Sequence, residues 1–163
     1  MSLQQEFELL RRVPFFADIE PAKLKLLAFM SERVAFDPGR PLVRQGEMAD
    51  AAYVIIEGEA EVVAETLEGP LLLARLGENA VVGEIAILCD VPRTATVRAK
   101  SRVVALRISK QPFMRMIREF PNMAVSIMCE LAHRLETTNL QLRNALSEVK
   151  RLKEDAGVAG APP

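Results

Sequence analysis

The stretch VGEIAILCDVPRTATV, residues 82–97, breaks a series of short strands with a Gly-Glu pair, an apolar run and a Pro-Arg-Thr-Ala run. Gly83 allows close backbone approach, and GEIAIL can form one helical turn whose free N–H groups attract an anion. Arg93 can donate two hydrogen bonds to a phosphate, whereas an ionised Glu84 can only accept them, for example from a ribose hydroxyl. This combination fits a small ligand with hydroxyls and one negative charge. The alternative is an ion pair that holds a loop to a sheet.

Brief β-branched runs separated by turn residues surround this stretch and predict an all-β region from Arg33 to Ile108. Strands are expected at residues 33–36, 41–44, 52–57, 59–65, 71–76, 94–99 and 102–108. The residues IIEGEAEVV predict a hairpin around Gly58. Short strands at this spacing favour a small sandwich or jelly-roll barrel, so the expected fold class is mainly β, a β-roll with flanking helices.

Helical periodicity appears on both sides of the strands. Helices are expected at residues 3–12, 21–32 and 110–119, and from roughly 123 to 154. Ser109 is placed to cap the third, and Pro121 separates the third from the fourth. We therefore expect a domain over 1–122, a long C-terminal helix over 123–155 and a disordered tail over 156–163.

The last helix carries apolar residues that step alternately by three and four. They are Val125, Met128, Ala132, Leu135, Asn139, Leu142, Leu146 and Val149, with Asn139 the polar exception. Such an a/d heptad pattern predicts a coiled coil, and hence a homodimer through this helix.

Composition excludes several classes of function. The formal net charge is −1 with interspersed charges, which disfavours nucleic acid as the primary partner. No stretch approaches the ~18 apolar residues of a membrane helix, so a cytoplasmic protein without a membrane partner is expected. Cys89 and Cys129 fit no redox motif and are expected to be buried thiols. His133 is the single histidine, which argues against a metal site and predicts a helix-surface residue.

The stretch at 82–97 resembles the phosphate-binding cassette of cyclic-nucleotide-binding domains, approximately G-E-[LI]-A-[LI] followed by P-R-[ATS]-A-[TS]. The resemblance extends upstream through LVRQGEMADAAYVIIEGEAEVV and covers roughly residues 10–140. One departure precedes the cassette, where the family often has Gly-Asp and this chain has Asn79-Ala80. Because Asn tolerates the left-handed conformation, we expect that turn to persist.

The resemblance implies a jelly-roll domain that binds cyclic AMP or cyclic GMP, with neither cofactor nor metal. It places Glu84 on the ribose 2′-hydroxyl and Arg93 on the cyclic phosphate, and it makes Gly83 part of the ligand-binding site. The other implied ligand-binding residues are Leu73, Val82, Ile85, Ala86, Thr94 and Ala95. Farther on, AHRLETTN resembles the long-helix segment of catabolite-activator-type regulators, which implies that Thr138 and Asn139 reach the adenine. For Asn139, selection of the coiled-coil register without ligand contact stays open.

The sequence thus predicts a non-enzymatic sensor that binds cyclic AMP or cyclic GMP and signals through an unknown effector protein. The main alternative is a ligand-free structural or interaction protein that dimerises through the coiled coil. A DNA-binding regulator is disfavoured, because the segment after Asn139 is expected to lack the helix-turn-helix that follows in activator-type relatives.

Overall fold

The computed structural model describes residues 2–159, and the chain divides into two compact units, residues 1–126 and 127–163. The helices are α1 (Leu3–Arg11), the 3-10 helix η1 (Pro14–Phe16), α2 (Pro21–Phe29), α3 (Glu84–Cys89), α4 (Lys110–Glu119) and α5 (Pro121–Ala159). The strands are β1 (Glu32–Phe36), β2 (Pro41–Val43), β3 (Ala51–Glu57), β4 (Ala60–Thr66), β5 (Gly69–Leu76), β6 (Val81–Val82), β7 (Thr96–Ala99) and β8 (Val103–Ser109).

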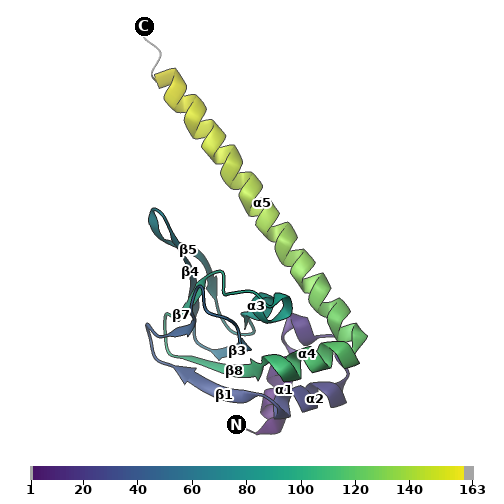
Figure 1. The fold of residues 1–163 in the computed structure, drawn as a ribbon. Helices are drawn as coiled ribbons and strands as arrows, with labels where there is room; N and C mark the ends of the chain where they lie inside the picture. Colours follow the sequence, from purple (N-terminus) through teal and green to yellow (C-terminus); the bar gives the residue numbers. More distant parts are fainter. Residues whose placement is uncertain (1, 160–163) are drawn as a thin grey trace. The chain divides into compact units, whose positions relative to one another are not determined.

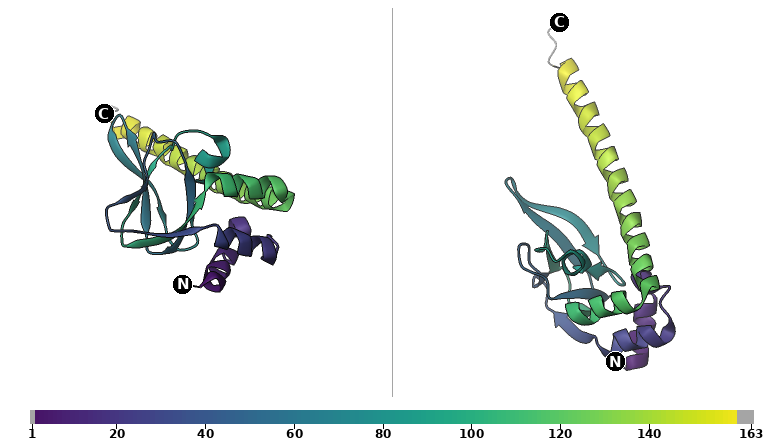
Figure 2. Two further views of the ribbon diagram at one scale, coloured as in Figure 1. Left: turned by 60° about the horizontal axis from the view of Figure 1, so that its bottom comes forward. Right: turned by 45° about the vertical axis from the view of Figure 1, so that its right-hand side comes forward.

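Two antiparallel four-stranded sheets form the β-roll of the first unit (Figures 1 and 2). Their strand orders are β1-β8-β3-β6 and β2-β7-β4-β5. Side chains along β7 alternate between buried and exposed, because Val97 and Ala99 are buried while Arg98 is exposed. The two sheets face each other through such buried side chains. The core between the sheets comprises Leu42, Val43, Ala51, Tyr53, Ile55, Ala60, Val82, Val97, Ala99, Val103 and Ala105. The predicted jelly-roll fold is confirmed.

The predicted hairpin around Gly58 is wrong. The chain turns there, but β3 pairs with β6 and β8 in one sheet, whereas β4 pairs with β5 and β7 in the other. Gly58 has a φ of 92°, and a Cβ at this position would collide with the carbonyl of Arg102. The glycine therefore serves a crossing between sheets, which local sequence does not distinguish from a hairpin turn.

One strand that the sequence did not predict leads directly into the cassette. The strand β6 has only Val81 and Val82, too few residues for a period-two signal, yet it pairs with β3. Before it, Asn79 has a φ of 67°, so the expected left-handed turn is present. The strand predicted at 94–99 begins only at Thr96. The 3-10 helix η1 was also not expected.

Helices α1, α2 and α4 lie together at one end of the β-roll (Figure 1). Their packing buries large side chains that a two-sheet core alone would not cover, including Leu10, Phe15, Phe16, Leu24, Leu27, Phe113 and Met116. Helix α2 ends at Phe29, earlier than expected. Ser109 precedes α4 but makes no side-chain cap, and its hydroxyl accepts a hydrogen bond from Arg107 at 3.0 Å instead.

Helix α5 is longer than predicted at both ends. It begins at Pro121, because proline is tolerated in the first turn of a helix. It continues to Ala159, so residues 156–159, expected to be disordered, are helical, while 160–163 lie outside the described residues. No proline interrupts the helical pattern before Pro162. The large apolar residues of its heptad pattern are 46–61% exposed.

Both cysteines are exposed, which corrects the expectation of buried thiols. Cys89 lies one helical turn after the exposed Ile85, on the outer face of α3. Cys129 lies one turn after the exposed Val125 on α5. An apolar neighbourhood in sequence therefore does not bury a residue on the outer side of a helix. His133 is exposed on α5, as predicted.

Candidate functional site

The cassette is a strand–turn–helix unit built on the end of β6. Gly83 follows that strand with a φ of 82° and caps the beginning of α3, and Asp90, the residue after α3, has a φ of 54°. Both residues have the left-handed backbone conformation, so the chain turns sharply at each end of a single short helix. This geometry brings Glu84, at the beginning of α3, and Arg93, just beyond it, onto one side of the β-roll. The helical turn expected in this stretch is confirmed.

Backbone contacts fix the segment that carries Arg93. The amide of Arg93 donates to the carbonyl of Glu47 at 2.9 Å, and its own carbonyl accepts from the amide of Gly46 at 2.8 Å. Pro92 forms an isolated antiparallel bridge with Met48. These contacts tie the loop after α3 to the loop between β2 and β3, so the Arg93 backbone is held before any ligand binds.

The guanidinium of Arg93 lies inside the site, and the residue is only 6% exposed. Its NH1 donates to the carbonyl of Gly83 at 2.9 Å, and its NH2 donates to the carbonyl of Ala51 at 2.6 Å. Burial lowers the pKa of the guanidinium, while the nearby Tyr53 and Asp50 oppose that shift. A buried cation held by two carbonyls is a pre-positioned partner for an anion.

Gly83 has a reason for being glycine that the sequence did not reveal. We expected it to allow backbone to approach a ligand, but a Cβ at Gly83 would collide with NH1 and crowd the rest of the Arg93 guanidinium. Its φ of 82° also disfavours any other residue. Gly83 therefore makes room for the arginine that its carbonyl holds.

Glu84 is the first residue of α3 and is only 3% exposed. Its charge helps to keep the pKa of Arg93 from falling further, so the two charges interact within the site. A carboxylate at this place can accept hydrogen bonds from hydroxyls. The pair therefore offers an acceptor and a cationic donor on one short segment.

The other predicted site residues occupy varied positions. Ala86 is buried, Ala95 is half-buried, Ile85 and Thr94 are exposed, and Val82 belongs to the core between the sheets. Leu73 is 54% exposed on β5. It has no cross-strand partner, because Val62 pairs with Ala74 and Val63 pairs with Leu72, which makes Leu73 the extra residue of a β-bulge.

Thr138 and Asn139 lie in the second unit, and both are exposed. The hydroxyl of Thr138 donates to the carbonyl of Arg134, one turn earlier, at 2.8 Å. Their predicted contact with a purine stays a prediction.

Ala51 and Asp50 support the site but were not predicted. The Asp50 carboxylate accepts a hydrogen bond from Arg107 at 2.7 Å, and the backbone carbonyl of Asp50 accepts one from the amide of Lys110 at 2.9 Å. The hydrogen bond with Asp50 raises the pKa of Arg107. Asp50 thereby anchors the beginning of β3, whose first carbonyl, that of Ala51, holds Arg93. Both residues fall within the stretch that carries the family resemblance, but no local pattern distinguishes them.

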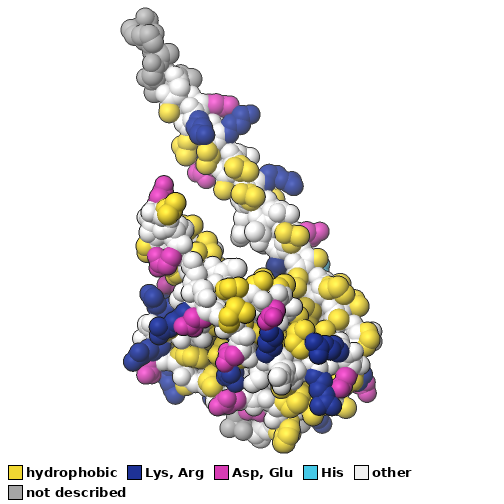
Figure 3. Space-filling model, in the orientation of Figure 1, with side chains coloured by type: hydrophobic (Ala, Val, Ile, Leu, Met, Phe, Trp, Pro, Cys, Tyr) yellow, Lys and Arg dark blue, Asp and Glu magenta, His cyan; other side chains and the backbone are white. Residues whose placement is uncertain are grey.

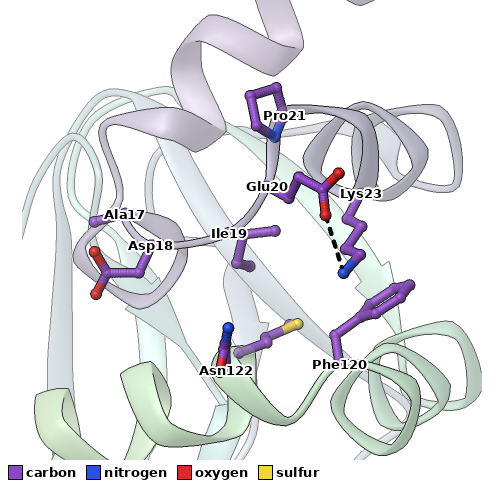
Figure 4. Close-up of a pocket in the computed structure, with 9 residues that line it drawn as sticks. Ala17, Asp18, Ile19, Glu20, Pro21, Lys23, Phe120 and Asn122 are labelled. Carbon is purple, nitrogen blue, oxygen red and sulfur yellow. Dashed lines mark ion pairs between the residues drawn. The ribbon is translucent and has the colours of Figure 1, made fainter.

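A separate pocket of about 340 Å³ lies between the segment before α2 and the junction of α4 with α5 (Figure 4). The ammonium of Lys23 lies 3.1 Å from a Glu20 carboxylate oxygen and 4.1 Å from the centroid of the Phe120 ring. The pocket includes no cassette residue, and its lining comes from segments far apart in sequence. It is therefore not the site that Glu84 and Arg93 form.

Within residues 2–159, no cluster of three or more His, Cys, Asp or Glu residues is arranged to hold a metal ion. Over the same residues, no helix combines the length and apolar character needed to cross a membrane.

Comparison with known proteins identifies the family of this arrangement. A family model described as "Cyclic nucleotide-binding domain" matches residues 33–120, which includes the whole cassette. The cAMP-dependent protein kinase regulatory subunit of Emericella nidulans is 32% identical over 108 residues, covering 66% of this chain and 26% of that protein. The chain thus spans about a quarter of the length of this relative.

Bacterial regulators match a larger part of the chain. The CRP-like cAMP-activated global transcriptional regulator of Mycobacterium tuberculosis is 27% identical over 140 residues, covering 85% of this chain and 62% of that protein. Among solved structures, the sensor domain of the transcriptional regulator DNR from Pseudomonas aeruginosa superposes with a TM-score of 0.74 at 27% identity. That match covers 83% of this chain and 91% of the DNR domain.

Proposed function

The chain belongs to the cyclic nucleotide-binding domain family, and on this premise we propose that it is a sensor that binds cyclic AMP or cyclic GMP. The observation that carries the proposal is the buried Arg93 guanidinium, held over the Gly83 turn beside Glu84. A cyclic phosphodiester has one negative charge, which suits one arginine. The ribose hydroxyl beside it suits one carboxylate.

Arg93 keeps donors available while it is held in place. A guanidinium has five N–H donors, and the carbonyls of Gly83 and Ala51 use two of them. The others can bind phosphate oxygens without loss of the two carbonyl contacts. Glu84 accepts the ribose 2′-hydroxyl in this proposal, and the backbone amides of Ile85 and Ala86 add donors at the first turn of α3.

Titration with fluorescent cyclic AMP and cyclic GMP tests the proposal. We expect saturable binding of at least one of them below millimolar concentration, with displacement by the unlabelled nucleotide. Identification of any nucleotide that remains bound after purification then decides which is preferred. If neither binds, the sensor assignment is wrong and the alternative of a ligand-free interaction protein stands.

The proposed sensor acts through binding and has no catalytic turnover. Its signal passes to an effector protein. Incubation of the pure protein with cyclic AMP, followed by chromatography of the products, should recover the nucleotide intact. Hydrolysis that a single substitution abolishes would contradict this part of the proposal.

We also propose that α5 forms a homodimer with a second copy of the chain. The heptad pattern extends from Val125 to Val149, and its large apolar side chains are exposed. Asn139 falls at an a position, where two asparagines meet at the axis of a parallel pair and fix its register. In such a dimer a purine can contact Thr138 of its own chain and Asn139 of the partner. Nucleotide binding and dimerisation would then strengthen each other.

Asn139→Leu is expected to leave a dimer at least as stable as the wild type, because leucine replaces a polar residue in the apolar seam. The same change should weaken discrimination between adenine and guanine. Sedimentation with and without each nucleotide measures the first effect, and competition titration measures the second. Asn144→Leu is the matched control, because Asn144 lies on the opposite side of α5. A monomeric wild type or an unchanged base preference would contradict this linkage.

A further inference from the structure

The outer face of the sheet β2-β7-β4-β5 carries a group of exposed basic side chains. Cross-strand pairing puts Arg98 of β7 opposite Glu61 of β4, and Glu61 opposite Arg75 of β5, so the three form one row across the sheet. Lys100 continues the exposed side of β7, and its amide donates to the carbonyl of Glu59 at 2.8 Å. We call this surface, with Arg40 and Arg102 at its border, the basic face.

Part of the positive charge on the basic face is not neutralised. Arg75 pairs with Glu61 at 3.5 Å, and Lys100 pairs with Glu59 at 3.5 Å. For residues 2–159, no ion pair or hydrogen bond is found for the guanidinium groups of Arg40, Arg98 and Arg102. Three of the five cations of the basic face therefore have no carboxylate partner within the described residues.

These cations lie close together. Pro41, next to Arg40, pairs with Arg98, and the amide of Ala99 donates to the carbonyl of Arg40 at 2.9 Å. Lys and Arg side chains also gather in Figure 3 where Figure 1 draws β7 and its neighbouring strands. Exposed arginines that lack a carboxylate partner in the fold repel one another, so an anionic partner would relieve a local cost.

We propose that the basic face is a docking surface for an acidic segment of a partner protein. The assignment goes beyond nucleotide binding and does not depend on it. The argument for an acidic partner is charge complementarity, because guanidinium groups bind carboxylates through paired hydrogen bonds. The side-chain charges along the row Arg98–Glu61–Arg75 are positive, negative and positive. A complementary peptide therefore has a carboxylate opposite each arginine and no charge opposite Glu61.

A polypeptide fits this alternation better than a uniform polyanion does. Neighbouring strands lie ~4.8 Å apart, which separates Arg98 from Arg75 by roughly 10 Å, the span of about three residues of extended peptide. A nucleic acid or an anionic bilayer would also bring negative charge against Glu61. The hairpin of the same sheet adds Glu65 and Glu68, which would repel an anionic bilayer.

The test uses the full chain and a fluorescent peptide that repeats Glu-Ser-Ser, measured by anisotropy at low and at physiological salt. We expect saturable binding that weakens with salt, and weaker binding of a peptide with the same composition but its glutamates in one block. Arg40→Gln with Arg98→Gln should weaken binding of the repeat peptide by at least about fivefold, the effect of two exposed charge contacts. Thermal unfolding and cyclic AMP titration of this variant should match those of the wild type.

Arg12→Gln with Arg118→Gln is the matched control, because it removes the same charge from exposed arginines elsewhere in the first unit. Equal losses in the two double variants would overturn the proposal, since they would indicate a general charge effect. Tighter binding of single-stranded DNA or of phosphatidylserine vesicles than of the peptide would also overturn it. Peptide binding without nucleotide binding would contradict only the proposed sensor function, and the reverse would contradict only the docking surface.

Discussion

Arg93→Ala should weaken cyclic nucleotide binding by at least about 2 kcal/mol, roughly thirtyfold, because the cyclic phosphate then loses its charged partner in a buried site. Titration with labelled cyclic AMP measures this effect. Arg98→Ala is the matched control, since Arg98 is exposed on the outer face of a sheet and should leave nucleotide affinity unchanged. Equal affinity of Arg93→Ala and wild type would contradict the assigned role of Arg93.

The same substitution should also lower the stability of the fold. Removal of the guanidinium takes a donor from the buried carbonyl of Ala51 and from the partly buried carbonyl of Gly83. Each such loss costs about 1–3 kcal/mol. Urea unfolding should therefore show Arg93→Ala destabilised relative to Arg98→Ala.

Arg93→Lys keeps the charge without the planar fork, so it should recover less nucleotide affinity than charge alone would predict.

The β-roll and the cassette could be predicted because their signals are local. Gly83, Glu84 and Arg93 lie within a single short stretch, and the strands around it have clear turn residues between them. A period-two pattern and a strand–turn–helix transition require no knowledge of distant contacts. The sequence therefore predicts the fold class and the charged pair of the site.

The contacts that hold Arg93 could not be predicted, because they join backbone atoms to a side chain across the fold. The carbonyl of Ala51 lies 42 positions from Arg93, and every residue type has a carbonyl. The same limit explains the wrong hairpin at Gly58. A glycine with positive φ suits a hairpin and a crossing between sheets equally well, and only the pairing of β3 and β4 distinguishes them.

The prediction that both cysteines are buried was wrong for a different reason. An apolar run predicts that a segment packs against the core, but on a helix only one side does so. Cys89 lies on the outer side of α3, although Ala86 and Ile87 of the same helix are buried. The bulge in β5 at Leu73 also has no signal in the local sequence, and the contact of Leu73 with a ligand stays a prediction.

Gly83→Ala is expected to have the second large effect, because it introduces two separate costs. A non-glycine residue at a φ of 82° costs about 1–2 kcal/mol of backbone strain. Its Cβ would also collide with NH1 of Arg93, so the guanidinium must leave the Gly83 carbonyl or the turn must shift. We expect loss of stability together with loss of nucleotide affinity, measured by urea unfolding and by titration.

Gly39→Ala separates these two costs, because Gly39 has a φ of 84° but no atom lies within 4 Å of the position that a Cβ would take there. It should show the strain alone and keep its nucleotide affinity. A double-mutant cycle with Arg93→Ala then isolates the collision. Once the guanidinium is absent, Gly83→Ala should cost no more stability than Gly39→Ala does. If Gly83→Ala costs the same with and without Arg93, then Gly83 is glycine for its backbone conformation alone, and the proposed coupling between the turn and the arginine is wrong.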